Sequence, residues 1–160
     1  MQFQFVIIET NLDKLRIRKK SMCYQFSKKS VERMQGVNPE LIIIFTEAIK
    51  NSPIDFGVPG LGGLRTAEQQ KKLFLAKKSE CDGYKNKSFH QSGNALDFYA
   101  YVDGSASWQK HHLAMVASVI MTTAKRLKKE GKTTVDLYWG GQFGSTDFTG
   151  WDYPHMEIAR

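Results

Sequence analysis

The stretch Ser88–Asp97, SFHQSGNALD, places a histidine and an aspartate on either side of a sharp turn. From residue 94 to residue 101, small or polar residues alternate with apolar ones, which is typical of a half-buried strand. Gly93, just before this segment, tolerates positive φ because it has no β-carbon, and it lets the chain turn back. We therefore predict that His90 lies on the loop entering a strand over 94–101, and that its imidazole reaches the carboxylate of Asp97.

A second stretch near the C-terminus, Asp152–Glu157, contains a histidine between two carboxylates. Pro154 has no backbone N–H, so a strand is predicted to begin at the proline or to lie at the edge of a sheet. His155 and Glu157 are two residues apart and would share one face of that strand. Asp152 would lie on the bend just before it.

Taken together, His90, Asp97 and His155 have the donor set of a catalytic zinc site. Such a site usually takes three protein ligands and leaves a fourth position for a water whose pKa falls to about 7. A carboxylate within an apolar strand is costly to bury unless it is paired or bound to a metal, which favours Asp97 as a ligand. We predict Zn²⁺ as the cofactor and metal-assisted hydrolysis as the chemistry.

Hydrolysis at such a site needs a base that takes a proton from water and passes it to the departing amine. A carboxylate close to the metal suits this role, and the residues leave two candidates, Asp152 and Glu157. Glu157 could instead orient a ligating imidazole, since such rings usually donate their other N–H to a carboxylate or a carbonyl.

A further functional candidate is Arg65. It precedes the segment Thr66–Gln69, whose Thr and Gln are typical of a capping box and predict the start of a helix. Arg65 would then lie beside the positive end of a helix dipole. A guanidinium there can donate to a carbonyl oxygen that gains negative charge, and losing one such donor typically costs about 3 kcal/mol of barrier.

Two motifs carry a resemblance to a known family. The first, S-x-H-x-x-G-x-A-x-D, begins at Ser88, and the second, D-x-x-H, begins at Asp152. Together they resemble the zinc peptidases that cut peptidoglycan stem peptides. That family includes D-alanyl-D-alanine carboxypeptidases, vancomycin-resistance dipeptidases and the L-alanyl-D-glutamate endopeptidases used as phage endolysins. The endolysin branch is the most similar, through segments 26–30, 36–41 and 63–66, and the resemblance extends from about Met22 to the end.

The resemblance implies a role for each candidate residue. It assigns zinc to the two histidines and the aspartate named above. It makes Asp152 the general base and leaves Glu157 as the alternative base or as a group that orients a histidine. Arg65 and Ser88 would bind or polarise the scissile carbonyl.

The remaining periodicity predicts an α+β domain. Helices are expected at 39–50, 66–77 and 107–129, and strands at 56–58, 94–101, 134–139 and 154–159. Because these strands are joined by one helix and a glycine-rich loop, we predict a small, largely antiparallel sheet with helices packed on it. The resemblance implies the same hedgehog and DD-peptidase-like fold.

Length and composition limit the class of protein. With 160 residues and 41% hydrophobic residues, the chain is expected to form one globular domain and a monomer. No apolar run approaches the roughly 20 residues that a membrane-spanning helix needs. Two cysteines without metal-binding or disulfide-scaffold spacing indicate a protein made in the reducing cytoplasm. The net charge of +7 indicates attraction to polyanions, for which we favour an anionic cell envelope.

The first 21 residues differ from the rest of the chain. They lack the charged start, apolar core and cleavage site of a secretory signal. We predict that residues 1–21 are an extension, either not native or upstream of the true start, and that residues 22–160 form the zinc peptidase domain.

The leading hypothesis is a zinc endopeptidase that cleaves the L-alanyl-D-glutamate bond of peptidoglycan stems. It would be a phage or prophage endolysin, made in the host cytoplasm and acting at the cell wall. A D-alanyl-D-alanine carboxypeptidase is the alternative with the same metal chemistry, and a non-catalytic zinc-binding module is an alternative of another class. Only charge supports a nucleic-acid-binding protein, and no specific nucleic-acid partner is expected.

Overall fold

The computed structural model describes residues 23–144, 147 and 150–159, so the predicted extension 1–21 lies outside the described residues. The helices in this part are α1 (Lys28–Arg33), α2 (Pro39–Lys50), α3 (Ala67–Leu75) and α4 (Lys110–Lys129). Two short 3₁₀ helices are η2 (Phe89–Ser92) and η3 (Gly140–Gln142). The strands are β1 (Asp55–Gly57), β2 (Ala95–Asp97), β3 (Tyr99–Val102), β4 (Ser105–Ser107), β5 (Leu137–Trp139) and β6 (His155–Ile158).

The predicted helices begin where their capping residues place them. The Asn38 side chain accepts a hydrogen bond from the N–H of Glu40, and proline occupies the first turn of α2. Thr66 and Gln69 form the predicted capping box at the start of α3. The longest helix, α4, begins three residues later than predicted, because Ser107 pairs with Ala100 of β3 and so belongs to a strand.

The strands form two small antiparallel sheets, ordered β1-β3-β4 and β2-β6-β5. The antiparallel α+β fold is therefore confirmed, but the single strand predicted over 94–101 is split in two at Phe98. Its N–H donates to the carbonyl of Pro154, while the segments before and after it pair in different sheets. A period of two indicates which side chains share a face, but it does not say which neighbouring strand each half will pair with.

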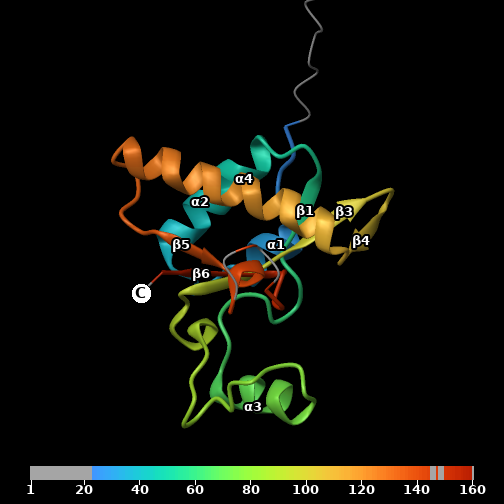
Figure 1. Cartoon of the computed structure of the whole chain (residues 1–160), viewed down its shortest axis with the longest axis vertical. Helices are drawn as coiled ribbons and strands as arrows, with labels where there is room; N and C mark the ends of the chain where they lie inside the picture. Colours follow the sequence, from blue (N-terminus) through green and yellow to red (C-terminus); the bar gives the residue numbers. More distant parts are fainter. Residues whose placement is uncertain (1–22, 145–146, 148–149, 160) are drawn as a thin grey trace, which may run out of the picture.

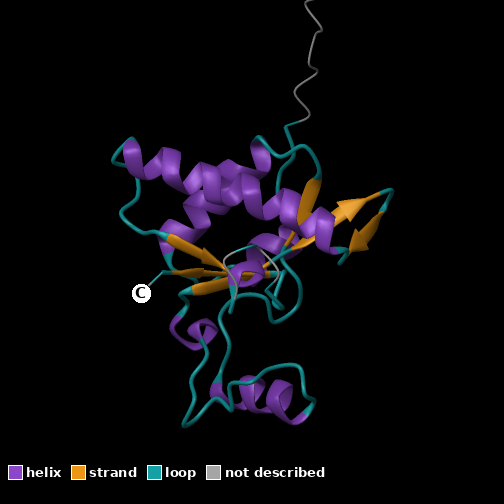
Figure 2. Cartoon of the chain, in the orientation of Figure 1, coloured by secondary structure: helices purple, strands orange, loops and turns teal. Residues whose placement is uncertain are grey.

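The core lies between the α2–α4 pair and the two sheets. Figure 1 and Figure 2 show α2 and α4 together on one side of β5 and β6, with α3 at the opposite end of the molecule. Phe45 of α2 contacts Phe56 and Phe98 edge to face. Each large side chain buried in this way contributes about 1.5–3 kcal/mol to stability. Among the described helices, none is long and apolar enough to cross a membrane.

Candidate active site

The structure brings the three predicted metal ligands to one point. The Nε2 atom of His90, the Oδ1 atom of Asp97 and the Nδ1 atom of His155 form a triangle in which each side is 3.1 Å. Ligand atoms about 2.0–2.1 Å from a tetrahedral zinc lie about 3.3 Å apart. The two histidines are almost completely buried. The spacing and the donor types therefore fit a zinc ion with one coordination position left over.

Local structure accounts for the position of each ligand. His90 lies in η2 rather than on a plain loop, and η2 ends at Gly93, whose φ of 72° is the predicted positive value. A β-carbon at residue 93 would lie 2.6 Å from the carbonyl oxygen of Gly36, so this turn requires glycine. Asp97 ends β2 and His155 begins β6, and these two residues are direct partners in the antiparallel register. Strand pairing thus brings two of the three ligands together.

The second nitrogen of each imidazole has its own acceptor. The Nδ1–H of His90 donates to the carbonyl of Gly63 at 2.9 Å, which leaves Nε2 free for a metal. The Nε2–H of His155 donates to Glu157 at 3.0 Å, so Nδ1 is the nitrogen that faces Asp97 and His90. Such partners orient ligating histidines and fix their tautomers. This contact suits a group that orients His155, which stays one of the two roles predicted for Glu157.

Gly63 is a site residue to which the sequence assigned no function. A β-carbon there would lie 2.0 Å from the carbonyl oxygen of Arg33, so only glycine lets the chain pass this close to Arg33. The neighbouring Gly62 accepts a hydrogen bond from the N–H of Asp97. The sequence signal was the doubled glycine, because adjacent glycines often mark a close approach of backbone to another group.

Arg65 lies against Asp97, a predicted metal ligand. Its guanidinium donates to Oδ2 of Asp97, the carboxylate oxygen that the histidines do not contact. Its Nε–H donates to the carbonyl of Leu61 at 2.5 Å, and the fully buried Gln70 accepts from its Nη1 at 3.4 Å. These hydrogen bonds hold the Arg65 guanidinium against Asp97. A contact between Arg65 and the scissile carbonyl stays a prediction.

The charges of the ligands depend strongly on one another. Burial opposes ionisation of Asp97, but the adjacent His90 and His155 outweigh it and hold the pKa of Asp97 well below its ordinary value. Burial lowers the pKa of His155, but hydrogen bonds to Asp97 and Glu157 outweigh this and raise it to about 9. In the metal-free protein at neutral pH, Asp97 is therefore ionised and His155 is protonated.

The ligands open onto a cavity of about 330 Å³. Asp152 lines it, and burial raises the pKa of this carboxyl group above its ordinary value. Ser88 lines it too, and its hydroxyl caps η2 by accepting from the N–H of His90. Phe143 forms another part of the wall, with its ring 5.6 Å from that of His155 and 5.8 Å from that of Trp151. Phe143 belongs to a glycine-rich stretch in which the sequence had marked no site residue.

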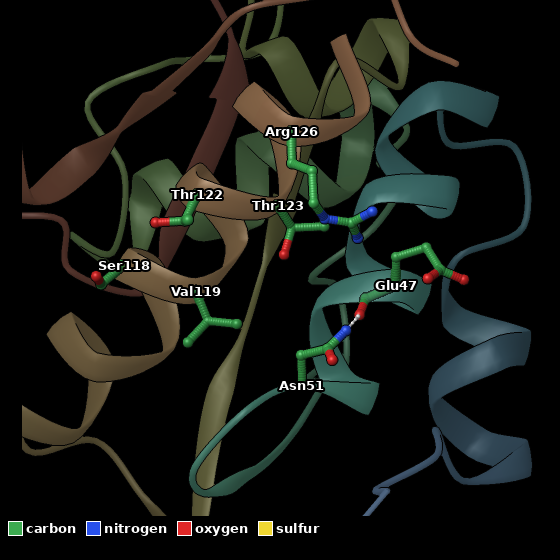
Figure 3. Close-up of a pocket in the computed structure, with 7 residues that line it drawn as sticks. All are labelled: Glu47, Asn51, Ser118, Val119, Thr122, Thr123 and Arg126. Carbon is green, nitrogen blue, oxygen red and sulfur yellow. Dashed lines mark hydrogen bonds between the residues drawn. The ribbon is translucent and has the colours of Figure 1, made fainter. Parts of the chain in front are cut away.

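A larger hollow lies elsewhere, between the end of α2 and the middle of α4. Figure 3 shows its lining, in which Asn51 donates to the backbone carbonyl of Glu47, and Arg126 reaches in from α4. Its volume is about 510 Å³. Among the described residues that line it, however, only Glu47 has a side chain of a type that commonly binds zinc. The three possible metal ligands therefore lie at the smaller cavity and not at this hollow.

Comparisons with known proteins found similar peptidases. A family model described as phage L-alanyl-D-glutamate peptidase matches residues 22–159. The L-alanyl-D-glutamate peptidase of Escherichia phage T5 is 32% identical over 140 residues, covering 87% of this chain and 92% of that protein. The crystal structure of the Serratia marcescens L-Ala D-Glu endopeptidase ChiX matches with a TM-score of 0.68 and 25% identity, covering 88% of this chain and 94% of that chain.

Proposed function

The chain belongs to the phage L-alanyl-D-glutamate peptidase family, and on that premise we propose that it is a zinc-dependent hydrolase of peptidoglycan stem peptides. The bond it cleaves would be the one between L-alanine and D-glutamate, as in the names of both relatives. As a phage endolysin, it would act on the cell wall of the host.

One observation carries the zinc dependence: three ligand atoms lie 3.1 Å apart, and both histidines have their other nitrogen hydrogen-bonded. The donor set of two imidazoles and one carboxylate is that of catalytic rather than structural zinc sites. When bound, zinc would polarise the scissile carbonyl and lower the pKa of a water molecule to about 7.

The protein's own residues would supply the remaining steps. Asp152, on the wall of the same cavity, would take a proton from the attacking water and pass it to the departing amine. The Ser88 hydroxyl accepts from His90 and, within the described residues, donates to no acceptor, so its hydrogen can bind the scissile carbonyl oxygen. Arg65 would keep Asp97 ionised and oriented, and its second proposed role is at that same carbonyl.

The alternatives differ from this proposal in specific ways. A D-alanyl-D-alanine carboxypeptidase would share the metal chemistry, but the matched family model and both relatives are named for the other bond. A non-catalytic zinc module would need no general base, yet a half-buried carboxylate, Asp152, lines the metal cavity.

The test is digestion of purified sacculi with and without a chelator, followed by mass spectrometry of the fragment termini. We expect new D-glutamate amino termini, loss of activity with chelator and recovery on addition of zinc. Release of free alanine would indicate the carboxypeptidase instead. Unchanged cleavage by chelator-treated protein shown to be free of metal would refute zinc dependence.

A further inference from the structure

The chemistry of the proposed substrate sets a requirement that the metal triad does not meet. A glutamate acylated on its nitrogen carries two carboxyl groups, and chain extension through either one leaves the other free. The departing half of the substrate therefore carries a carboxylate only a few bonds from the scissile nitrogen. A carboxylate that leaves water for a cleft is stabilised only by a cation or by several hydrogen-bond donors.

Three cationic side chains line the cavity that holds the triad: Arg65, Lys78 and Lys87. Arg65 already has its proposed roles on Asp97 and at the scissile carbonyl, and its guanidinium is hydrogen-bonded to Asp97, Leu61 and Gln70. Lys78 and Lys87 are exposed, and neither forms an ion pair with another residue in the part of the chain that the structure describes. Asn86, which can donate from its side-chain amide, lies on the same wall.

The backbone that carries Lys78 is fixed by the end of α3. The helix closes with hydrogen bonds from the N–H of Lys77 to Phe74 and from the N–H of Lys78 to Leu73, both at 2.9 Å. This is the pattern of a Schellman motif, with Lys77 at a φ of 56°. Just beyond it, the buried Gln70 amide donates to the Ser79 hydroxyl and to the carbonyl of Cys81.

The loop that carries Lys87 is also held in place. One oxygen of Asp82 accepts from the N–H groups of Tyr84 and Asn86, each at 2.9 Å. Gly83 bonds to the carbonyl of Asn86 and accepts from the Gln91 side chain, which ties the loop to η2. A wall ordered before the substrate arrives loses less entropy on binding.

The acidic residues of the cavity do not remove the need for these lysines. Asp97 and Glu157 are hydrogen-bonded to histidines, and Asp152 is the proposed base. Of the described carboxylates lining the cavity, only Glu80 has no such role. Its single negative charge does not balance the positive charges of Lys78 and Lys87, so this wall carries a net positive charge.

We propose that Lys78 and Lys87, with Asn86, form the subsite for the free carboxylate of the glutamyl residue and so determine specificity for glutamate on the departing side of the bond. This inference rests on the proposed function and adds a binding role for residues outside the metal triad.

The test compares two synthetic stem peptides that differ only at the free carboxyl group of glutamate, which is a carboxylate in one and a primary amide in the other. The zinc-loaded parent should have the lower KM for the carboxylate peptide. In the double variant Lys78→Gln/Lys87→Gln, we expect KM for that peptide to rise about tenfold, as for two partly solvated ion pairs. Its kcat, its zinc content and its KM for the amide peptide should stay near those of the parent.

The matched control is Lys85→Gln, which removes one positive charge from the same loop but does not line the cavity. It should leave both KM values unchanged. Equal KM values for the two peptides in the parent, or an equal rise for both peptides in the double variant, would overturn the subsite while leaving the peptidase assignment intact. Cleavage of neither peptide by zinc-loaded parent would overturn the proposed function, and this inference with it.

Discussion

At the scale of single residues, Asp97 links the metal triad to the rest of the fold. One carboxylate oxygen lies 3.1 Å from both ligating nitrogens, and the other accepts from Arg65. Partners of this kind typically contribute 10- to 100-fold to metal affinity. Arg65 can therefore influence catalysis without touching the substrate.

Replacing Arg65 separates its two proposed roles. In Arg65→Lys, the positive charge remains but the planar guanidinium is lost, so we expect zinc affinity to fall about tenfold. If Arg65 also binds the scissile carbonyl, kcat at saturating zinc should fall as well, by up to about 100-fold. Zinc titration and steady-state kinetics at saturating zinc measure the two effects. Unchanged zinc affinity would contradict the positioning role.

Asp152 is the residue on which the base assignment depends. Because Asp152→Asn keeps the shape of the side chain but cannot accept a proton, we expect kcat to fall about 10²- to 10⁴-fold. Zinc content should stay at that of the parent, since Asp152 is not in the triad. Glu157→Gln is the companion variant, and a larger kcat loss there, with zinc retained, would transfer the role of base to Glu157.

The charge of His155 is predicted to make zinc uptake depend on pH. Its pKa in the metal-free protein is raised to about 9, so below pH 9 a proton occupies the imidazole that zinc must bind. We expect zinc affinity to rise with pH by up to about tenfold per unit between pH 7 and pH 9, and then to level off. Titration calorimetry in buffers of different ionisation enthalpy should detect proton release at pH 7. A zinc affinity independent of pH over this range would contradict the prediction.

At the scale of elements, capping residues made the helices predictable. Asn38, Thr66 and Gln69 make the predicted capping hydrogen bonds, because capping needs only residues close in sequence. The strands were harder to predict. Residues 94–101 alternate as one strand would, yet they divide between two sheets, because pairing partners come from distant parts of the chain.

The end of α3 provides a stability prediction. Lys77 adopts a left-handed conformation, which costs a residue with a β-carbon about 1 kcal/mol. Lys77→Gly should therefore raise the free energy of unfolding by up to about 1 kcal/mol, as measured by denaturant unfolding. Lys72→Gly, within the same helix, is the control and should lower it by about 1 kcal/mol. Equal effects of the two substitutions would rule out the conformational explanation.

At the scale of the whole molecule, the described core and the site use residues from Tyr24 onward. We therefore expect a chain that starts at Met22 to retain zinc binding, a melting temperature within a few degrees of the parent's, and full cleavage of sacculi. Thermal unfolding and sacculus digestion of the two forms compare them directly. A large loss of stability in the shorter chain would show that residues 1–21 belong to the folded domain.

The sequence by itself determined the candidates for the chemistry, which are two histidines, an aspartate and a possible base, and it determined where the capped helices α2 and α3 begin. Local spacing suffices for these, because a turn at Gly93 or a cap at Thr66 depends on neighbouring residues. Only the tertiary structure decided how the site is assembled. The contacts of His90 with Gly63, of Arg65 with Asp97 and of His90 with His155 join residues 27, 32 and 65 positions apart. Strand register and packing set such long-range contacts, and no local pattern specifies them.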